Sequence, residues 1–295
     1  MSVQLSFEVQ PPHNPAKAPN FWQLIKTLEK LHPTFISITY GVSGKDRTAT
    51  AEAAKMLAAT TAVPAAPHLT VVGSSRAEVV AMIERMLQAQ ARIFLALRGD
   101  TPANTAQRQQ SAGELTSACE LIQLIRQVDS EMWAPSDVKH QEAPPLAIGV
   151  AAFPGGNRRA GTTQTQEVNR LLEKQSAGAD FAITQLIFAA ESYLSFLTEA
   201  RAAGVTIPII PGLFPVVSRD DLLRTAALTG VEVPVAVIDR ITSETARGSE
   251  YQSGIKGTAE LAQELLADGA PGLHFFTFNR HRPVTHVLEL LELQN

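Results

Sequence analysis

The stretch from Ala177 to Gln185 reads Ala-Gly-Ala-Asp-Phe-Ala-Ile-Thr-Gln: a turn containing glycine, a short apolar run and a polar residue at its end. A glycine turn ahead of an apolar run predicts the passage from a helix into a buried strand. The same signal recurs at 203–206, Ala-Gly-Val-Thr, and at 268–272, Asp-Gly-Ala-Pro-Gly. The repetition indicates one strand-and-helix unit that is used several times.

Eight short apolar runs alternate with longer segments of helical period along the chain. The runs cover residues 4–8, 35–39, 65–69, 93–97, 146–152, 181–185, 207–211 and 273–278. Helical period marks 21–31, 48–59, 77–89, 114–128, 166–176, 191–202 and 258–266. Open parallel sheets more often have about five or six strands, so eight units predict a closed (β/α)8 barrel. We expect residues 1–295 to form this barrel as a single domain.

Composition excludes several classes of protein. The 25 Lys and Arg against 29 Asp and Glu give a formal net charge of -4, so the chain has no excess of basic residues for binding nucleic acid. The sequence begins without a basic, apolar leader and has no apolar run of about 18 residues, so we expect a cytoplasmic protein without a membrane span. The seven histidines are scattered, and no spacing typical of a metal site is present.

Polar residues stand where the apolar runs end, which is where barrels of this kind carry their active sites. Side chains alternate along a strand, so Ser6 shares the face of Glu8, and this polar face is expected to line the lumen. One polar residue at a strand end is commonly a cap or a solvated group, but six such ends out of eight predict a site. The residues are Glu8, Thr39, His68, Arg98-Gly99-Asp100, Gln185 and Asn279-Arg280. GxGxxG, Walker and GxSxG motifs are absent from the sequence.

Seven segments, in order, resemble the methylenetetrahydrofolate reductase family between residue 5 and about residue 282. They are Ser6-Phe7-Glu8 with Pro11-Pro12, Ser37 to Gly41, Pro67 to Thr70, Ala96 to Asp100, Ala182 to Gln185, Pro211-Gly212 with Pro215, and Asn279-Arg280. The resemblance implies a (β/α)8 barrel that reduces 5,10-methylenetetrahydrofolate to 5-methyltetrahydrofolate for one-carbon metabolism and methionine biosynthesis. In this family NADH or NADPH supplies the electrons, and FAD normally relays them.

The carboxylates fit this chemistry. The methylene bridge accepts a hydride only after the folate ring opens to an iminium cation, which requires a proton donor. Glu8, partly desolvated at the mouth, is expected to keep a raised pKa and to give that proton, as the family assigns to its matching glutamate. Asp100 is expected to stabilise the cation as a carboxylate. The resemblance implies that Gln185 and Thr39 contact the substrate, and Arg280 is a candidate clamp for its glutamate carboxylate, although a surface ion pair is the alternative for Arg280.

The departures from the family concentrate on the flavin. The family carries Tyr-Pro and His-Pro-Glu after the fifth strand, whereas this chain reads Phe153-Pro-Gly-Gly-Asn-Arg-Arg159. Candidate cofactor contacts that remain are Thr39, His68, Arg98, Gly99, Phe153 and Lys174. Either FAD binds through altered contacts, or hydride passes directly from the nicotinamide, as in a flavin-independent branch of the family, and the sequence favours the second. Arg158 and Arg159 are then candidates for the dinucleotide pyrophosphate, with a solvated charge pair as the alternative.

A different class of function is also open: a non-catalytic folate-binding accessory protein on the same barrel. Retention of both Glu8 and Asp100 favours the enzyme, because binding alone gives little reason to hold two carboxylates where a cation forms. The expected partners are methylenetetrahydrofolate and a nicotinamide dinucleotide. The sequence leaves open the choice between NADH and NADPH and the oligomeric state.

Overall fold

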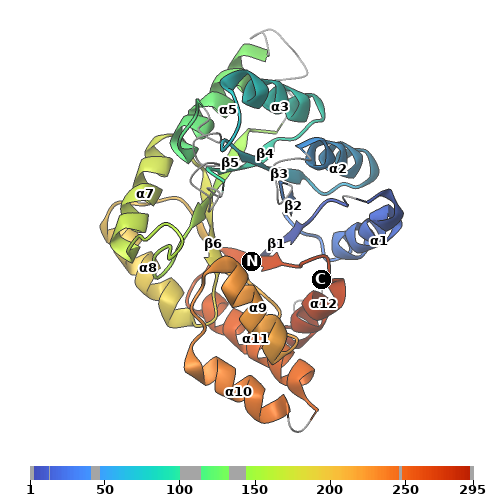
Figure 1. The fold of residues 1–295 in the computed structure, drawn as a ribbon, viewed down its shortest axis with the longest axis vertical. Helices are drawn as coiled ribbons and strands as arrows, with labels where there is room; N and C mark the ends of the chain where they lie inside the picture. Colours follow the sequence, from blue (N-terminus) through green and yellow to red (C-terminus); the bar gives the residue numbers. More distant parts are fainter. Residues whose placement is uncertain are drawn as a thin grey trace.

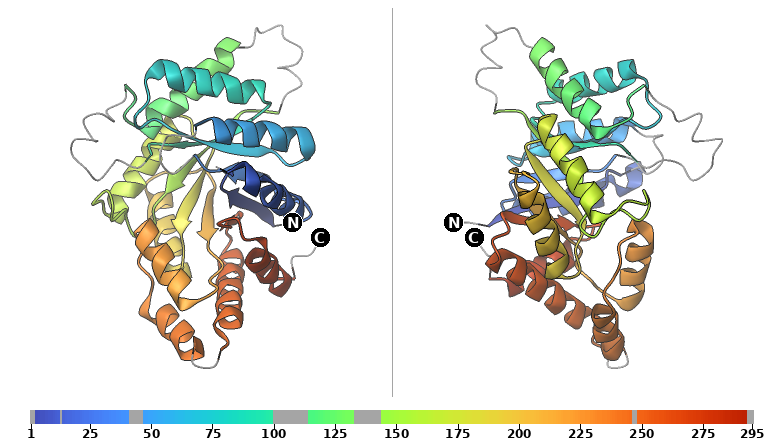
Figure 2. Two further views of the ribbon diagram at one scale, coloured as in Figure 1. Left: turned by 45° about the vertical axis from the view of Figure 1, so that its right-hand side comes forward. Right: turned by 90° about the vertical axis from the view of Figure 1, so that its left-hand side faces the viewer.

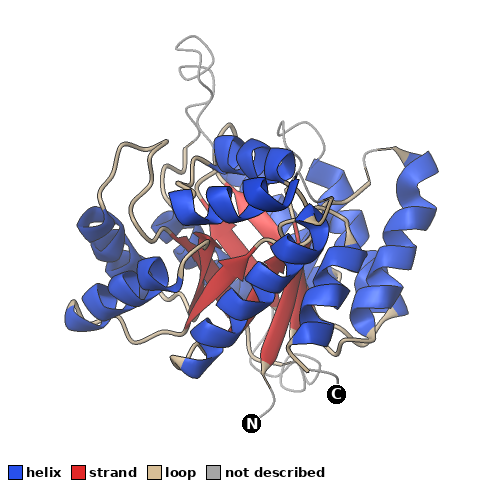
Figure 3. Ribbon diagram, turned by 90° about the horizontal axis from the view of Figure 1, so that it is seen from below, coloured by secondary structure: helices blue, strands red, loops and turns tan. Residues whose placement is uncertain are grey.

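In a computed structural model of the chain, eight parallel strands close into a barrel and helices surround them (Figures 1 and 3). The structure describes residues 3–12, 14–40, 47–99, 114–132, 144–245 and 248–292. The strands are β1 (Gln4–Val9), β2 (Phe35–Ile38), β3 (Ala65–Thr70), β4 (Ile93–Leu97), β5 (Ala147–Ala152), β6 (Phe181–Leu186), β7 (Ile209–Leu213) and β8 (Gly272–Phe276). Each strand pairs with the next, and β8 pairs with β1. The predicted (β/α)8 barrel is confirmed.

The helices follow the strands in the expected alternation. They are η1 (Pro15–Lys17), α1 (Ala18–Glu29), α2 (Arg47–Thr60), α3 (Arg76–Gln88), α5 (Ala118–Met132), α7 (Gln164–Ser176), α8 (Ala190–Ala202), α9 (Arg219–Thr229), α10 (Val235–Thr245), α11 (Glu250–Ala267) and α12 (His281–Leu290). The glycines of the three predicted turns, at positions 178, 204 and 269, all have positive φ, a conformation that glycine adopts without strain. These turns end helices directly before β6, β7 and β8.

Three helices were not predicted from the sequence: α9, α10 and α12. The first two lie in the connection between β7 and β8, where they form a group with α11 on one side of the barrel (Figures 1 and 2). A small apolar cluster joins this group to the barrel mouth; its buried members are Leu186, Phe188, Phe214, Val216, Leu222 and Ile241. The group therefore extends the wall of the mouth next to β7 and β8.

The two faces of each strand are packed differently. Phe7 and Phe275 are fully buried in the large apolar core that the strands share with the helices. On the other face, a separate apolar cluster lies inside the barrel and consists of Phe35, Ala66, Ile93, Leu95, Phe181, Ile183 and Phe276. The barrel interior therefore holds a packed apolar cluster, with buried polar side chains such as Ser6 and His274 beside it.

Glycine is required inside the barrel at position 149. A Cβ atom there would lie 2.4 Å from Cζ of Phe181 and 2.5 Å from Cδ2 of Leu95. The ring of Phe181 occupies this space and packs 5.6 Å from the ring of Phe35, centroid to centroid. Because Gly149 has no side chain, the rings of Phe181 and Phe35 fit inside the barrel.

Candidate active site

Glu8 lies at the carboxyl end of β1 and faces the barrel interior. In the strand register it is the partner of Ser37 on β2 and of Phe276 on β8, and partners in register lie on the same face of a sheet. Only 18% of its side chain is exposed. Burial raises the pKa of Glu8 to about 8, because the charged form loses its hydration. This direction is the one expected from the sequence.

His68 on β3 lies beside Glu8. Its Nε2 atom lies 3.6 Å from Oε2 of Glu8, and 9% of the imidazole side chain is exposed. Burial lowers the pKa of His68 to about 3. Between these two pKa values the acid is protonated and the imidazole is neutral, so this is a contact of two uncharged groups rather than an ion pair.

A second histidine, His274, lies deeper in the interior. Its Nδ1 atom is 2.8 Å from Oγ of Ser6, the register partner of His274 on β1. Burial and then the neighbouring His68 lower the pKa of His274 to about 3. Its ring packs edge-on against Phe276, 5.0 Å between centroids. His274 was not singled out from the sequence, although it lies two residues before Phe276 on the same strand face and the alternation that exposed Ser6 and Glu8 could have found it.

A tight turn after β8 is fastened to the end of β1. Thr277 donates its hydroxyl to the backbone carbonyl of Glu8 at 2.7 Å. Asn279 exchanges two hydrogen bonds with the backbone of Gln10, each of 2.8 Å. Phe278 and Asn279 have φ of 46° and 58°. This left-handed backbone is uncommon outside glycine, above all for a bulky residue such as Phe278. The turn fixes the segment that carries Glu8.

The remaining predicted substrate contacts lie at the same end of the barrel. Gln185 lies at a register shift in β6, and its Oε1 accepts the N–H of Leu186 at 2.9 Å. Simple alternation therefore does not fix the direction of this side chain. Thr39 is half-buried directly after β2, and its carbonyl accepts the hydroxyl of Thr50.

Arg280 already has protein partners. One of its guanidinium nitrogens lies 2.9 Å from Oδ2 of Asp221, at the start of α9, and 37% of the Arg280 side chain is exposed. The guanidinium carbon also lies 5.6 Å from the centre of the Phe214 ring. The ion pair that the sequence left as the alternative is present, and the exposed part of the guanidinium remains accessible.

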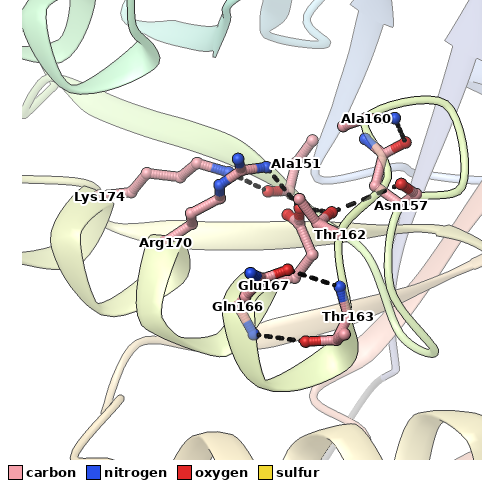
Figure 4. A network of polar contacts seen from close by, with 9 residues as sticks. All are labelled: Ala151, Asn157, Ala160, Thr162, Thr163, Gln166, Glu167, Arg170 and Lys174. Atoms are coloured by element: carbon pink, nitrogen blue, oxygen red, sulfur yellow. Dashed lines mark hydrogen bonds and ion pairs between the residues drawn. The ribbon is translucent and has the colours of Figure 1, made fainter.

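The candidate cofactor contacts are dispersed. Arg98 is exposed after β4, and Gly99 has a φ of 89°. Phe153 is half-buried after β5. The ammonium group of Lys174 donates to the carbonyl of Ala151 at 2.8 Å, and burial lowers the pKa of this lysine. Lys174 thus bridges α7 and β5 (Figure 4).

The loop after β5 is held by its own contacts (Figure 4). The buried carboxylate of Glu167 accepts from Thr162 and from Arg170, and Asn157 pairs with Thr162 across the loop. Gly156 has a φ of 94°, and a Cβ there would lie 2.4 Å from the carbonyl of Thr162. The loop therefore folds as a compact turn at the place where the family carries its histidine and glutamate.

Arg158 and Arg159 reach from this loop to α9. Arg158 forms an exposed ion pair with Glu232, and Arg159 donates to the carbonyl of Leu228 in the last turn of α9. Both line a surface hollow of about 380 Å³ together with Ala226, Ala227, Gly230 and Val231. The structure brings the two arginines together beside α9.

Asp100, the second predicted carboxylate, lies outside the described residues. Within the described ranges, no group of three or more His, Cys, Asp or Glu side chains is arranged to hold a metal ion. No helix in that part of the chain is both long and apolar enough to span a membrane.

The comparisons with known proteins decide the family. The model of the family described as "Methylenetetrahydrofolate reductase" matches residues 1–292. The chain belongs to the methylenetetrahydrofolate reductase family. It is 30% identical to the 5,10-methylenetetrahydrofolate reductase of Pectobacterium carotovorum over 281 residues, 94% of this chain and 86% of that one. It is also 30% identical to the Escherichia coli protein of the same name, over 94% of this chain and 87% of that one.

A solved structure shares the barrel fold of this chain. It is a protein of Clostridium thermocellum described as binding two copies of 5-methyl-5,6,7,8-tetrahydrofolic acid, with a TM-score of 0.66 and 17% identity. The match covers 98% of this chain and 94% of that one. At 17% identity, the similarity shows that the two proteins share the barrel fold and shows nothing about their ligands. The predicted family is therefore confirmed by sequence, and the predicted fold by structure.

Proposed function

We propose that this chain reduces 5,10-methylenetetrahydrofolate to 5-methyltetrahydrofolate, with Glu8 as the proton donor. The observation that carries the proposal is a carboxyl group at the barrel mouth whose pKa is raised to about 8, beside an uncharged imidazole. Such a group still holds its proton near neutral pH and can give it to a leaving nitrogen. Membership of the family, with relatives named for this reaction over most of their length, supports the same assignment.

The reaction divides into a proton step and a hydride step. Glu8 gives its proton to N10 as the bond between N10 and the methylene carbon breaks, and the electron pair of that bond stays on N10. The lone pair of N5 then forms the iminium, which Asp100 stabilises as a carboxylate. NADH or NADPH supplies the hydride, which adds to the methylene carbon and leaves a methyl group on N5. The Glu8 carboxylate regains a proton from solvent after the product leaves.

Several side chains hold the substrate in this proposal. Gln185 would present its amide nitrogen to the pterin edge, while its Oε1 accepts the N–H of Leu186. Thr39 lies beside the same mouth. Arg280 presents the exposed part of its guanidinium to the glutamate tail of the folate, while Asp221 and Phe214 hold the other part in place.

We propose that the hydride reaches the folate without a flavin. Three contacts of the described residues support this proposal: Lys174 is engaged with Ala151, His68 faces Glu8, and the loop after β5 forms a compact turn. Arg98, Gly99 and Phe153 remain candidates for the nicotinamide dinucleotide. Arg158 and Arg159 are candidates for its pyrophosphate, and Arg158 would exchange Glu232 for a phosphate oxygen there. A nicotinamide can reduce an iminium directly, so loss of flavin need not remove the reaction.

The test is NADH oxidation by the purified protein. We expect a colourless preparation, without the visible absorption of flavin, to oxidise NADH only when methylenetetrahydrofolate is present and to form 5-methyltetrahydrofolate. Folate binding without any turnover, with NADH or with NADPH, would instead identify the accessory protein. A yellow preparation that loses its activity with its flavin would overturn the direct route but not the reaction.

A further inference from the structure

Three buried polar atoms in the barrel interior have no hydrogen-bond partner among the described residues: Oγ of Ser37, Nε2 of His68 and Nε2 of His274. Most buried polar groups in proteins are paired, so each exception calls for an explanation. Two of these atoms belong to residues around one carboxyl group. Ser37 is the register partner of Glu8, and Nε2 of His68 lies 3.6 Å from Oε2 of Glu8.

The resting state of Glu8 explains why Oγ of Ser37 and Nε2 of His68 have no partner in the described part of the chain. A protonated carboxyl group attracts donors weakly, and 3.6 Å is longer than a hydrogen bond between nitrogen and oxygen. A carboxylate attracts the same donors strongly, because charge-assisted hydrogen bonds are shorter and about twice as strong as neutral ones. Nε2 of His68 therefore lies where negative charge forms when Glu8 loses its proton, and Ser37 is the neighbour of Glu8 on the adjacent strand.

The surroundings of Glu8 offer few competing charges. The titratable groups that face this position from the packed strands are His68 on β3 and His274 on β8, and burial keeps both uncharged at neutral pH. Arg98 follows β4 and is exposed, and Asp100 lies outside the described residues. A Glu8 carboxylate would thus be stabilised by neutral hydrogen-bond donors, which are already in place when the charge forms.

We propose that His68 is a positioning residue for Glu8: its neutral imidazole, with the hydrogen on Nε2, and the hydroxyl of Ser37 form a donor pocket for the carboxylate that Glu8 becomes when it protonates folate. This role rests on the proposed function. It assigns to His68 a place in the proton step instead of a contact with a flavin.

Nitrogen NMR of His68 tests the proposal without turnover. In labelled protein we expect a neutral imidazole with its hydrogen on Nε2, and a downfield shift of that hydrogen as the pH rises through the pKa of Glu8. The shift should vanish in Glu8→Gln. A charged imidazole near neutral pH, or a hydrogen on Nδ1, would overturn the proposal.

Kinetics of His68→Leu provide the second test. Removing one preorganised donor to a developing anion lowers kcat by about 100-fold in other enzymes, and we expect a loss of that order with little change in KM for either substrate. Donors to a carboxylate lower its pKa, so their removal must move the alkaline limb of the pH profile of kcat/KM to higher pH. If His68 had only a structural role, its removal would not move the alkaline limb of the kcat/KM profile to higher pH.

Matched variants complete the design. His68→Gln keeps an N–H donor and should recover most of the lost rate, and Ser37→Ala should lower kcat less than His68→Leu. Ser6→Ala, one layer deeper, serves as the control and should leave kcat nearly unchanged. If Glu8→Gln is inactive but His68→Leu keeps the native kcat and the native alkaline limb of the pH profile, the donor pocket is refuted and the proposed function is not. If Glu8→Gln is normally active, the proposed function itself is refuted. A rise only in KM for NADH would assign His68 to the dinucleotide.

Discussion

The Nε2 atom of His68 lies 3.6 Å from Oε2 of Glu8, and near neutral pH neither side chain is charged. An acid that gives up a proton in each turnover must hold that proton until the substrate arrives. A charged imidazole at this distance would lower the pKa of Glu8 and release the proton early. The neutral state of His68 is therefore part of what keeps Glu8 an acid.

The first prediction concerns stability as a function of pH. The pKa of Glu8 rises from 4.5 to about 8 on folding. The contribution of Glu8 to stability is therefore fully present below 4.5 and is lost as the pH rises towards 8. Glu8→Gln removes this loss, so we expect the free energy of unfolding of the variant to gain roughly 4 to 5 kcal/mol over that of the native chain as the pH rises from below 4.5 to about 8. Urea unfolding of both chains, once below pH 4.5 and once near pH 8, measures this difference in the free energy of unfolding.

Glu84→Gln is the control for this comparison, because Glu84 is exposed on α3. It should show no comparable gain at alkaline pH. A Glu8→Gln variant whose stability changes with pH in parallel with the native chain would show that Glu8 ionises normally in the folded protein.

The second prediction concerns the turn after β8. Asn279→Gly removes two hydrogen bonds to Gln10 but tolerates the positive φ, and we expect a loss of about 1 to 2 kcal/mol in the free energy of unfolding. Asn279→Ala loses the same bonds and also takes a left-handed backbone, which costs about 1 kcal/mol more. Both variants should lower kcat, since the turn holds the segment that carries Glu8. Equal stability of the two variants would show that the backbone conformation at Asn279 is not maintained.

The third prediction concerns the packed interior. A Cβ atom at position 149 would lie 2.4 Å from Cζ of Phe181. Overpacking of this kind costs about 1 to 3 kcal/mol, so Gly149→Ala should lower the free energy of unfolding by that amount. Adding Phe181→Leu should recover part of the loss, because it vacates the space. A stable Gly149→Ala variant would place the Phe181 ring elsewhere.

The fourth prediction concerns the dinucleotide. An exposed ion pair is worth about 0 to 1 kcal/mol, so Arg158 can leave Glu232 at little cost. We expect Arg158→Ala to raise KM for NADH several-fold with kcat unchanged. Glu232→Gln should lower KM for NADH, because it frees Arg158 from its ion pair. Arg240→Ala, which breaks the exposed pair with Glu260 on α11, is the control. An unchanged KM in Arg158→Ala would leave this arginine a structural contact between the loop and α9.

Much of the architecture could be predicted from the sequence, since each strand is a buried apolar run bounded by turn residues. The last strand was expected to reach Phe278 but ends at Phe276, because Thr277 and Asn279 turn the chain back onto β1. Helices α9 and α10 were missed, although Ser218 caps α9 and Gly230 ends it with a positive φ. Their region lacks the regular alternation with strands that revealed the other helices.

The site was predictable where strand alternation decides it and unpredictable where distant contacts do. Glu8 and His68 were expected at the mouth, because polar residues that end barrel strands meet there. The pairing of Arg280 with Asp221 joins residues 59 positions apart, and no local pattern predicts it. The register shift in β6 likewise breaks the alternation at Gln185, and Asp100 lies outside the described residues.

The most direct measurement is the rate of NADH oxidation with methylenetetrahydrofolate for the native chain and for Glu8→Gln across pH. We expect the native kcat/KM to fall above about pH 8, where Glu8 loses its proton. We expect Glu8→Gln to bind folate yet to lose about 100-fold or more in kcat, the usual contribution of a general acid. A Glu8→Gln variant that turns over at the native rate would contradict the account.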